Sequence, residues 1–166
     1  METDAIKKFI MKVPFFQVFN DHELNKLVGK QKVFKDCKKG ESIFKEGDSG
    51  DSLFVLIFGH IELVKTSDKG LDIVIMEIQA GTVFGEIAML TKRRRNLAAR
   101  AVSTKVVVME FTNSFIDKLI PSVQTKFHKQ LLFVLAKNLD NMNMRYAKLS
   151  SSVEIREQLA EGGEIR

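Results

Sequence analysis

Residues 84–102, FGEIAMLTKRRRNLAARAV, place a glycine and a lone acid, Gly85-Glu86, a few residues before a basic run at 92–95. We expect Phe84 to end a strand and residues 86–90 to form one helical turn. Gly85 then lets the backbone approach a ligand closely, and the first amides of the turn are unpaired donors suited to an anion. An arginine from the far end of the loop adds charge-assisted hydrogen bonds to phosphate oxygens. Glu86 suits a sugar hydroxyl, so the stretch predicts a pocket for a sugar phosphate.

On both sides of this stretch, short β-prone runs alternate with glycine turns. Strand-length runs at this spacing indicate a β-sandwich or barrel. The runs are residues 32–34, 42–44, 53–58, 61–64, 71–78 and 106–111.

The two ends of the chain show helical periodicity instead. Apolar residues recur at helical spacing from Ile6 to Val13, and Asn20-Asp21 can cap a short helix over 22–28. Thr112-Asn113 can cap another over 114–119, before a long helix over 122–149 that the serines at 150–152 end. The predicted fold is mainly β: a jelly-roll-like sandwich (31–111, with the phosphate loop at 84–97) between N-terminal helices (1–30) and C-terminal helices and a tail (112–166).

The long helix carries a stripe of apolar residues at alternating steps of three and four, which is typical of a coiled-coil seam. A second stripe, Phe127, Leu131 and Val134, lies on another face and can dock on the β-sandwich. We therefore expect a homodimer through this helix, the alternative being a single wide core face. The seam residues are Leu132, Leu135, Leu139, Met142, Tyr146 and Leu149.

Composition supports one packed domain with an appended element. Of the 166 residues, 45% are hydrophobic and 28% charged, which is enough apolar material for a core. The longest apolar run, residues 53–58, is far too short for a membrane span. The N-terminus has no signal-peptide pattern, and a single cysteine, Cys37, is typical of a reducing compartment. We expect a cytoplasmic protein with no membrane segment.

The stretch at 84–102 resembles the phosphate-binding cassette of the cyclic nucleotide-binding domain family. That cassette opens with a Phe-Gly-Glu-(Leu/Ile)-Ala-Leu-type sequence and has an arginine nine or ten residues later, followed by small residues. Here the opening is residues 84–90, and Arg95 stands nine residues after Glu86. The glycines at 40, 47, 50, 59 and 81 also match the family's β-roll, so the resemblance covers about residues 14–149.

The resemblance implies a role for each matching residue. Glu86 accepts a hydrogen bond from the ribose hydroxyl, and Arg95 pairs with the phosphate. The C-terminal helix closes over the base, with Asn143 as the candidate base contact. The implied ligand-binding residues are Phe84, Gly85, Glu86, Ile87, Ala88, Arg95, Asn96, Leu97 and Asn143.

The chain departs from the family pattern beside the arginine. Arg94 stands where the family often has proline and is an alternative partner for the phosphate. Asn96 and Leu97 replace small residues; Leu97 would crowd the phosphate, and Asn96 lacks the hydroxyl that some members use against guanine. The expected ligand is therefore cAMP, with cGMP less favoured.

Other functions find less support in the sequence. His22, His60 and His128 have no metal-site spacing, so we expect no metal and no catalysis. The segment after the serines is short and acidic, unlike a helix-turn-helix, so direct DNA binding is not expected. The favoured function is a regulatory domain without its own effector, which acts through a downstream protein partner still to be identified. The alternative is a degenerate member that binds no nucleotide and serves as a dimerisation or protein-interaction module.

Overall fold

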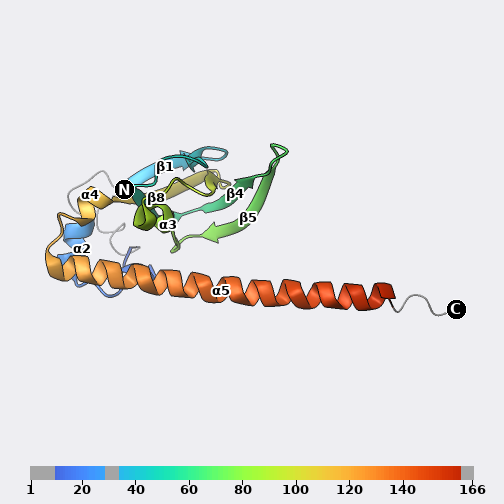
Figure 1. The fold of residues 1–166 in the computed structure, drawn as a ribbon. Helices are drawn as coiled ribbons and strands as arrows, with labels where there is room; N and C mark the ends of the chain where they lie inside the picture. Colours follow the sequence, from blue (N-terminus) through green and yellow to red (C-terminus); the bar gives the residue numbers. More distant parts are fainter. Residues whose placement is uncertain (1–9, 29–33, 162–166) are drawn as a thin grey trace. The chain divides into compact units, whose positions relative to one another are not determined.

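The computed structural model describes residues 10–28 and 34–161, with side chains up to residue 152. The chain forms two compact units, Met1–His128 and Lys129–Arg166, and each is described by itself. Among the described residues, the first unit contains the strands, and residues 129–161 of the second unit form the remainder of the last helix (Figure 1). The helix expected over residues 6–13 lies largely outside the described residues.

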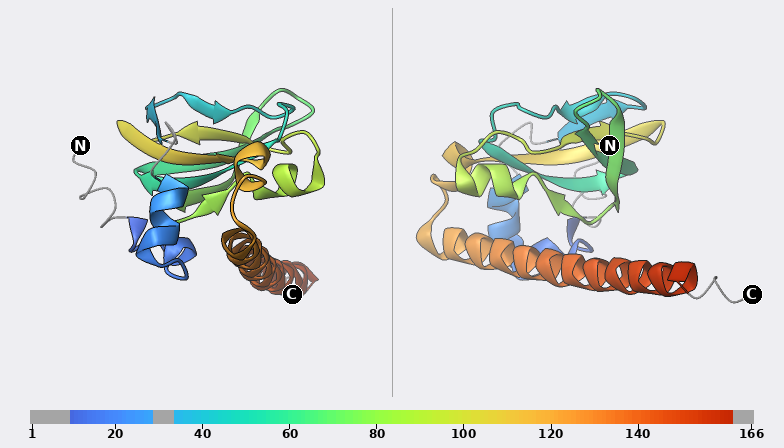
Figure 2. Two further views of the ribbon diagram at one scale, coloured as in Figure 1. Left: turned by 90° about the vertical axis from the view of Figure 1, so that its left-hand side faces the viewer. Right: turned by 45° about the vertical axis from the view of Figure 1, so that its right-hand side comes forward.

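The strands of the described residues form two four-stranded antiparallel sheets, which make up the β-sandwich that the sequence predicts. One sheet has the order β1 (Phe34–Lys38), β8 (Lys105–Thr112), β3 (Ser52–Phe58) and β6 (Val83–Phe84). The other has the order β2 (Ser42–Phe44), β7 (Ala98–Ala101), β4 (His60–Thr66) and β5 (Asp72–Gln79). Figure 2 shows the two layers of this sandwich from two sides.

The core lies between the two sheets. Both contribute to one cluster of buried residues, among them Leu56 and Val108 from one sheet and Ile61 and Ala99 from the other. Cys37 on the edge strand β1 belongs to the same cluster and is 4% exposed. Burial raises the pKa of its thiol. The prediction of a β-sandwich is therefore confirmed.

A cluster of phenylalanines outside this core attaches the helical segments to β8. Phe16 in the 3₁₀ turn η1 (Pro14–Phe16) and Phe127 lie 6.0 Å and 5.5 Å from the Phe111 ring. Phe15 meets Phe127 edge-on at 5.0 Å. Phe127 begins the expected docking stripe and is fully buried, so the start of the last helix packs as predicted.

Helix α2 (Asp21–Val28) begins with the predicted cap at Asn20. The Asn20 side chain accepts from the Glu23 amide at 2.9 Å, and the Glu23 carboxylate accepts from the Asn20 amide at 2.9 Å. This reciprocal pair is a capping box. Both Glu23 oxygens also accept from Lys126 Nζ, at 2.7 and 2.8 Å, which ties α2 to the first turns of the last helix.

The short helix α4 (Asn113–Ile116) has Thr112 as its cap, as expected, because the Thr112 hydroxyl accepts from the Phe115 amide at 3.3 Å. The long helix α5 runs from Pro121 to Glu161. The prediction that the serines at 150–152 end it was wrong. Ser151 and Ser152 donate their hydroxyls to the carbonyls of Ala147 and Leu149, at 2.9 and 2.7 Å, so they are accommodated within the helix.

Candidate functional site

The stretch 84–95 folds as a strand end, a single short helix and a returning loop. Phe84 ends β6, Gly85 has a φ of +76°, and α3 (Glu86–Thr91) begins directly after it. A left-handed φ is costly for residues with a Cβ, which explains glycine at this position. Lys92 ends the helix with a φ of +54° and is the one non-glycine residue with positive φ in the described part of the chain.

Arg95 returns beneath Gly85 and is buried, with 4% of its surface exposed. Its Nη1 donates to the Gly85 carbonyl at 2.6 Å. Its Nη2 donates to the Ser52 carbonyl at 2.7 Å and lies 3.1 Å from the Ser52 hydroxyl. The guanidinium also lies over the Phe44 ring, 4.4 Å from its centroid. The two ends of the stretch therefore meet, as the sequence predicts.

One polar atom of this arginine remains unused. Among the described residues, Arg95 Nε is the one buried side-chain nitrogen or oxygen without a hydrogen-bond partner. A buried donor without an acceptor is unfavourable in a folded protein. Nε is thus a donor that an anionic ligand atom would satisfy.

The charges around Arg95 are acidic. Burial lowers the pKa of the guanidinium, while the negative charges of Asp51, Glu110, Asp48 and Glu86 raise it. Arginine keeps its proton at neutral pH in such surroundings. The site therefore retains a cation in its interior.

Backbone hydrogen bonds fix the loop of Arg95 against the turn at 45–48. The Gly47 amide donates to the Arg95 carbonyl and the Arg95 amide to the Asp48 carbonyl, both at 2.9 Å. Arg94 is exposed and donates its Nη1 to the Gly47 carbonyl at 2.7 Å. Of the two candidate partners for the phosphate, Arg95 is therefore buried and Arg94 is exposed. Which of them pairs with the phosphate stays a prediction.

The other predicted site residues differ in their surroundings. Glu86 is 4% exposed, near enough to Arg95 for its charge to act there. Phe84 stacks on Phe54 with centroids 5.4 Å apart and so contributes to the core. Ala88 is buried beneath Gly50, where an added Cβ would lie 2.3 Å from Ala88 Cβ. Ile87 is exposed.

Asn96 and Leu97, which follow Arg95, are less buried than the arginine. Asn96 is exposed and its carbonyl accepts from Lys65 Nζ at 3.2 Å, whereas Leu97 is half-buried. Asn143 is exposed on α5 within the second unit. Its predicted contact with a base therefore stays a prediction.

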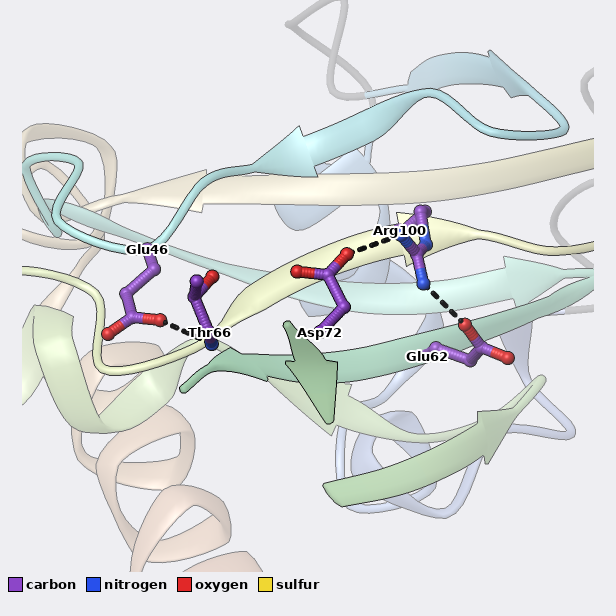
Figure 3. Close-up of polar contacts among 5 residues, drawn as sticks. All are labelled: Glu46, Glu62, Thr66, Asp72 and Arg100. Atoms are coloured by element: carbon purple, nitrogen blue, oxygen red, sulfur yellow. Dashed lines mark hydrogen bonds and ion pairs between the residues drawn. The ribbon is translucent and has the colours of Figure 1, made fainter. Parts of the chain in front are cut away.

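Ion pairs on the second sheet hold the strand that follows the loop. Arg100 on β7 donates to Asp72 at 2.9 Å and to Glu62 at 3.2 Å (Figure 3). Glu46 accepts from the Thr66 amide at 3.0 Å and pairs with Lys65. These contacts connect β7, β4 and β5, so the loop is followed by an anchored strand.

Two residues that contact Arg95, Ser52 and Phe44, were not among the predicted site residues. Ser52 supplies two acceptors to Arg95, and Phe44 supplies the ring beneath the guanidinium. The glycine-rich turn before Ser52 was the one sequence signal near these residues. It could not show that Ser52 contacts Arg95, because the two residues are distant in the sequence and meet only when the strands pair.

The described residues contain no cluster of His, Cys, Asp and Glu that could hold a metal ion. A search of the described helices finds none that combines the length and the apolar character of a membrane span.

Comparisons with known proteins agree with this geometry. Residues 34–122, more than half of the chain, match the cyclic nucleotide-binding domain family. A cAMP-dependent protein kinase regulatory subunit of Mycosarcoma maydis is 29% identical over 100 residues, which are 57% of this chain and 19% of that protein. A CRP-like cAMP-activated global transcriptional regulator of Mycobacterium tuberculosis is 25% identical over 114 residues, which are 69% of this chain and 50% of that protein.

Solved structures show the same fold. A cyclic nucleotide-binding domain from Methylobacillus flagellatus aligns with a TM-score of 0.72 at 19% identity, covering 85% of this chain and 83% of that one. The chain spans half or less of the length of the two curated relatives above. The matched region, residues 34–122, contains both the two sheets and the buried Arg95. This chain belongs to the cyclic nucleotide-binding domain family.

Proposed function

We propose that the chain binds a cyclic nucleotide, with cAMP as the preferred ligand, at an inner site formed by residues 85–88 and Arg95. The observation that carries the proposal is the buried Arg95 guanidinium, which lies against Gly85 with its Nε unpartnered. A cyclic phosphate carries one negative charge, and an arginine in a water-poor site is suited to hold it.

The other residues of the inner site bind different groups of the ligand. The backbone amides at 85–88 approach the phosphate, because Gly85 has no side chain to block them. Glu86 is buried and accepts from the ribose hydroxyl. The choice of cAMP over cGMP comes from the sequence beside Arg95, because the relatives include both a cAMP-dependent protein kinase regulatory subunit and a cGMP-dependent protein kinase. Asn96, which has no hydroxyl to meet a guanine, supports the same choice.

Ligand binding then acts through α5. The boundary between the two compact units falls within this helix, after His128. In the proposed mechanism the segment beyond residue 128 moves over the base, with Asn143 contacting it, and passes the signal to a protein partner. Such coupling requires that the ligand bind one position of the helix more tightly than the other.

Calorimetry with cAMP and cGMP tests the proposal. Wild-type protein should bind cAMP with a micromolar dissociation constant, and Arg95→Ala should weaken binding by about a hundredfold, since charged hydrogen bonds are worth about 1.5–3 kcal/mol. Arg93→Ala, an exposed arginine of the same loop, should bind like wild type. Circular dichroism of each variant separates lost binding from lost folding. The absence of heat with both nucleotides, for folded wild-type protein, would refute the proposal.

A second candidate function also has an observation in its favour. Both terminal nitrogens of Arg95 already donate to protein acceptors, Gly85 and Ser52. Leu97, two residues after Arg95, is half-buried and stands where the family has a small residue. A member whose arginine already uses both terminal nitrogens within the protein would keep the fold as a protein-interaction module and bind no nucleotide. The same titrations decide between the two functions.

The proposed partner of the second unit is another copy of the chain. Five of the six seam residues of α5 are large, exposed and apolar, with exposed fractions of 57–75%. Solvent-facing apolar side chains at heptad spacing are stabilised by a partner helix. This homodimer is independent of which ligand the first unit binds.

A further inference from the structure

A second pocket, called the outer pocket below, is lined mostly by exposed residues, some of them in the loop that leads to Arg95. It has a volume of about 380 Å³ and is lined by the turn 49–51, the loop 92–94 and Asn113. The volume falls within the range of small-molecule sites, at its lower end. Neither Gly85 nor Arg95 lines this pocket, so it is distinct from the site described above.

The walls of this outer pocket are held in place. Gly50 packs so closely that an added Cβ would lie 2.3 Å from Ala88 Cβ and 2.7 Å from the Arg93 carbonyl. The Asn113 amide donates to the Asp51 carbonyl at 2.9 Å. The bond from Arg94 Nη1 to the Gly47 carbonyl positions one guanidinium of the wall. The pocket is therefore formed by segments that are fixed to one another.

The outer pocket carries a net positive charge. Lys92, Arg93 and Arg94 contribute three cations and Asp51 one carboxylate, a net charge of 3 − 1 = +2. All three cations of loop 92–94 are exposed, and Arg94 donates to a backbone carbonyl, that of Gly47, at 2.7 Å. Three adjacent like charges repel one another unless an anion lies between them.

From these observations we propose that the outer pocket binds a small phosphate-bearing anion, a diphosphate group that is free or at the end of a nucleotide. Two guanidinium groups and an ammonium match the several oxygens of such a group better than a single carboxylate. The cations stand in one tripeptide around a bounded cavity, whereas a nucleic-acid strand requires a basic groove along its backbone. The pocket size also favours a small anion.

Titration calorimetry with inorganic pyrophosphate tests the site, at about 0.15 M ionic strength, where long-range attraction is screened beyond about 8 Å. The variant Lys92→Gln/Arg93→Gln should weaken binding at least about tenfold. The control Lys69→Gln/Lys105→Gln removes two exposed charges elsewhere in the unit and should change the affinity by less than about twofold. Arg95→Ala should weaken pyrophosphate binding less than Lys92→Gln/Arg93→Gln does, because Arg95 does not line this pocket.

Each other outcome overturns the proposal. Equal losses in both double variants would mean general charge attraction, and a loss only in Arg95→Ala would place pyrophosphate in the inner site. An absence of saturable heat would mean that no such ligand binds. If Arg95→Ala does not fold, amide chemical shifts of wild type decide, since they must change at 49–51, 92–94 and 113 and not at 85–88. ADP in place of pyrophosphate distinguishes a nucleotide-borne diphosphate from a free one by its tighter binding.

The failure of this proposal is separable from failure of the cyclic nucleotide proposal. The variant Lys92→Gln/Arg93→Gln keeps every residue assigned to the inner site, so its cAMP affinity should equal that of wild type. Loss of cAMP binding in that variant would mean that the two pockets are one site, which would overturn the assignment of a separate outer pocket.

Discussion

Gly85 combines a backbone requirement with a packing requirement. Its φ is +76°, and an added Cβ would lie 2.8 Å from Arg95 Nη1 and 3.3 Å from the rings of Phe44 and Phe54. Gly70, in the turn between β4 and β5, shares the backbone requirement alone: its φ is +74°, and nothing lies within 4 Å of an added Cβ. The two glycines therefore form a matched pair.

We predict that Gly70→Ala costs about 1–2 kcal/mol of unfolding free energy, the usual penalty for a left-handed alanine. Gly85→Ala should cost clearly more and should displace the Arg95 guanidinium, which would weaken cAMP binding. Urea denaturation measures the unfolding free energy of both variants, and calorimetry measures their cAMP affinity. Equal destabilisation by the two substitutions would contradict the close packing described at Gly85.

At this scale the sequence predicted the meeting of Gly85 and Arg95, because spacing within one motif determines it. It did not predict Ser52 or Phe44, which reach the guanidinium through the pairing of β3 with β6 and of β2 with β7. Such contacts depend on register between distant strands, and a local pattern does not contain that information.

The bond between α2 and α5 gives a pH-dependent prediction. The hydrogen bond from Lys126, together with that from the Asn20 amide, holds the pKa of Glu23 below its usual value. A carboxyl group with a lowered folded-state pKa adds stability above its unfolded-state pKa and loses it as pH falls through the folded-state pKa. The stability difference between wild type and Glu23→Gln should therefore be present at neutral pH and disappear in acid.

Urea midpoints measured from neutral pH to about pH 3 check this prediction. Glu77→Gln provides the control, since Glu77 is an exposed carboxylate of β5. Its difference from wild type should vary much less with pH. A Glu23→Gln difference that stays constant down to the lowest pH would show that the ion pair adds nothing to folding.

Most elements could be predicted because their signals were local. Glycine turns separated the strands, and Asn20 and Thr112 identified two helix starts. Strand β7 was missed because its sequence, Ala-Ala-Arg-Ala, has low β propensity; pairing with β2 and β4 and the ion pairs of Arg100 place it in the sheet. The serines at 150–152 were read as a helix end, although serine can bond to its own helix.

The whole molecule is predicted to be a dimer through α5. Met142 lies on the seam and Met144 on another face, with nearly equal exposed fractions of 61% and 60%. A glutamate at position 142 would place charge inside the helix pair, whereas one at 144 would remain in solvent. The pair separates a seam effect from any general effect of added charge.

Sedimentation equilibrium at roughly tens of micromolar, above the micromolar dissociation constants of modest interfaces, should give a dimer for wild type and for Met144→Glu. It should give a monomer for Met142→Glu. A wild-type monomer at that concentration would exclude the seam. The cAMP affinity of the Met142→Glu monomer would show whether the first unit binds ligand independently of assembly.

The position of the single cysteine offers a way to measure local opening of the β-sandwich. Cys37 lies in β1, and β6, the strand that leads into Gly85, lies at the opposite edge of the same sheet. Burial and a raised pKa keep its thiol unreactive until β1 separates from β8. The rate of thiol labelling therefore reports the opening free energy of that edge. A ligand that slows labelling there would show that binding beside β6 stabilises the opposite edge of the sheet.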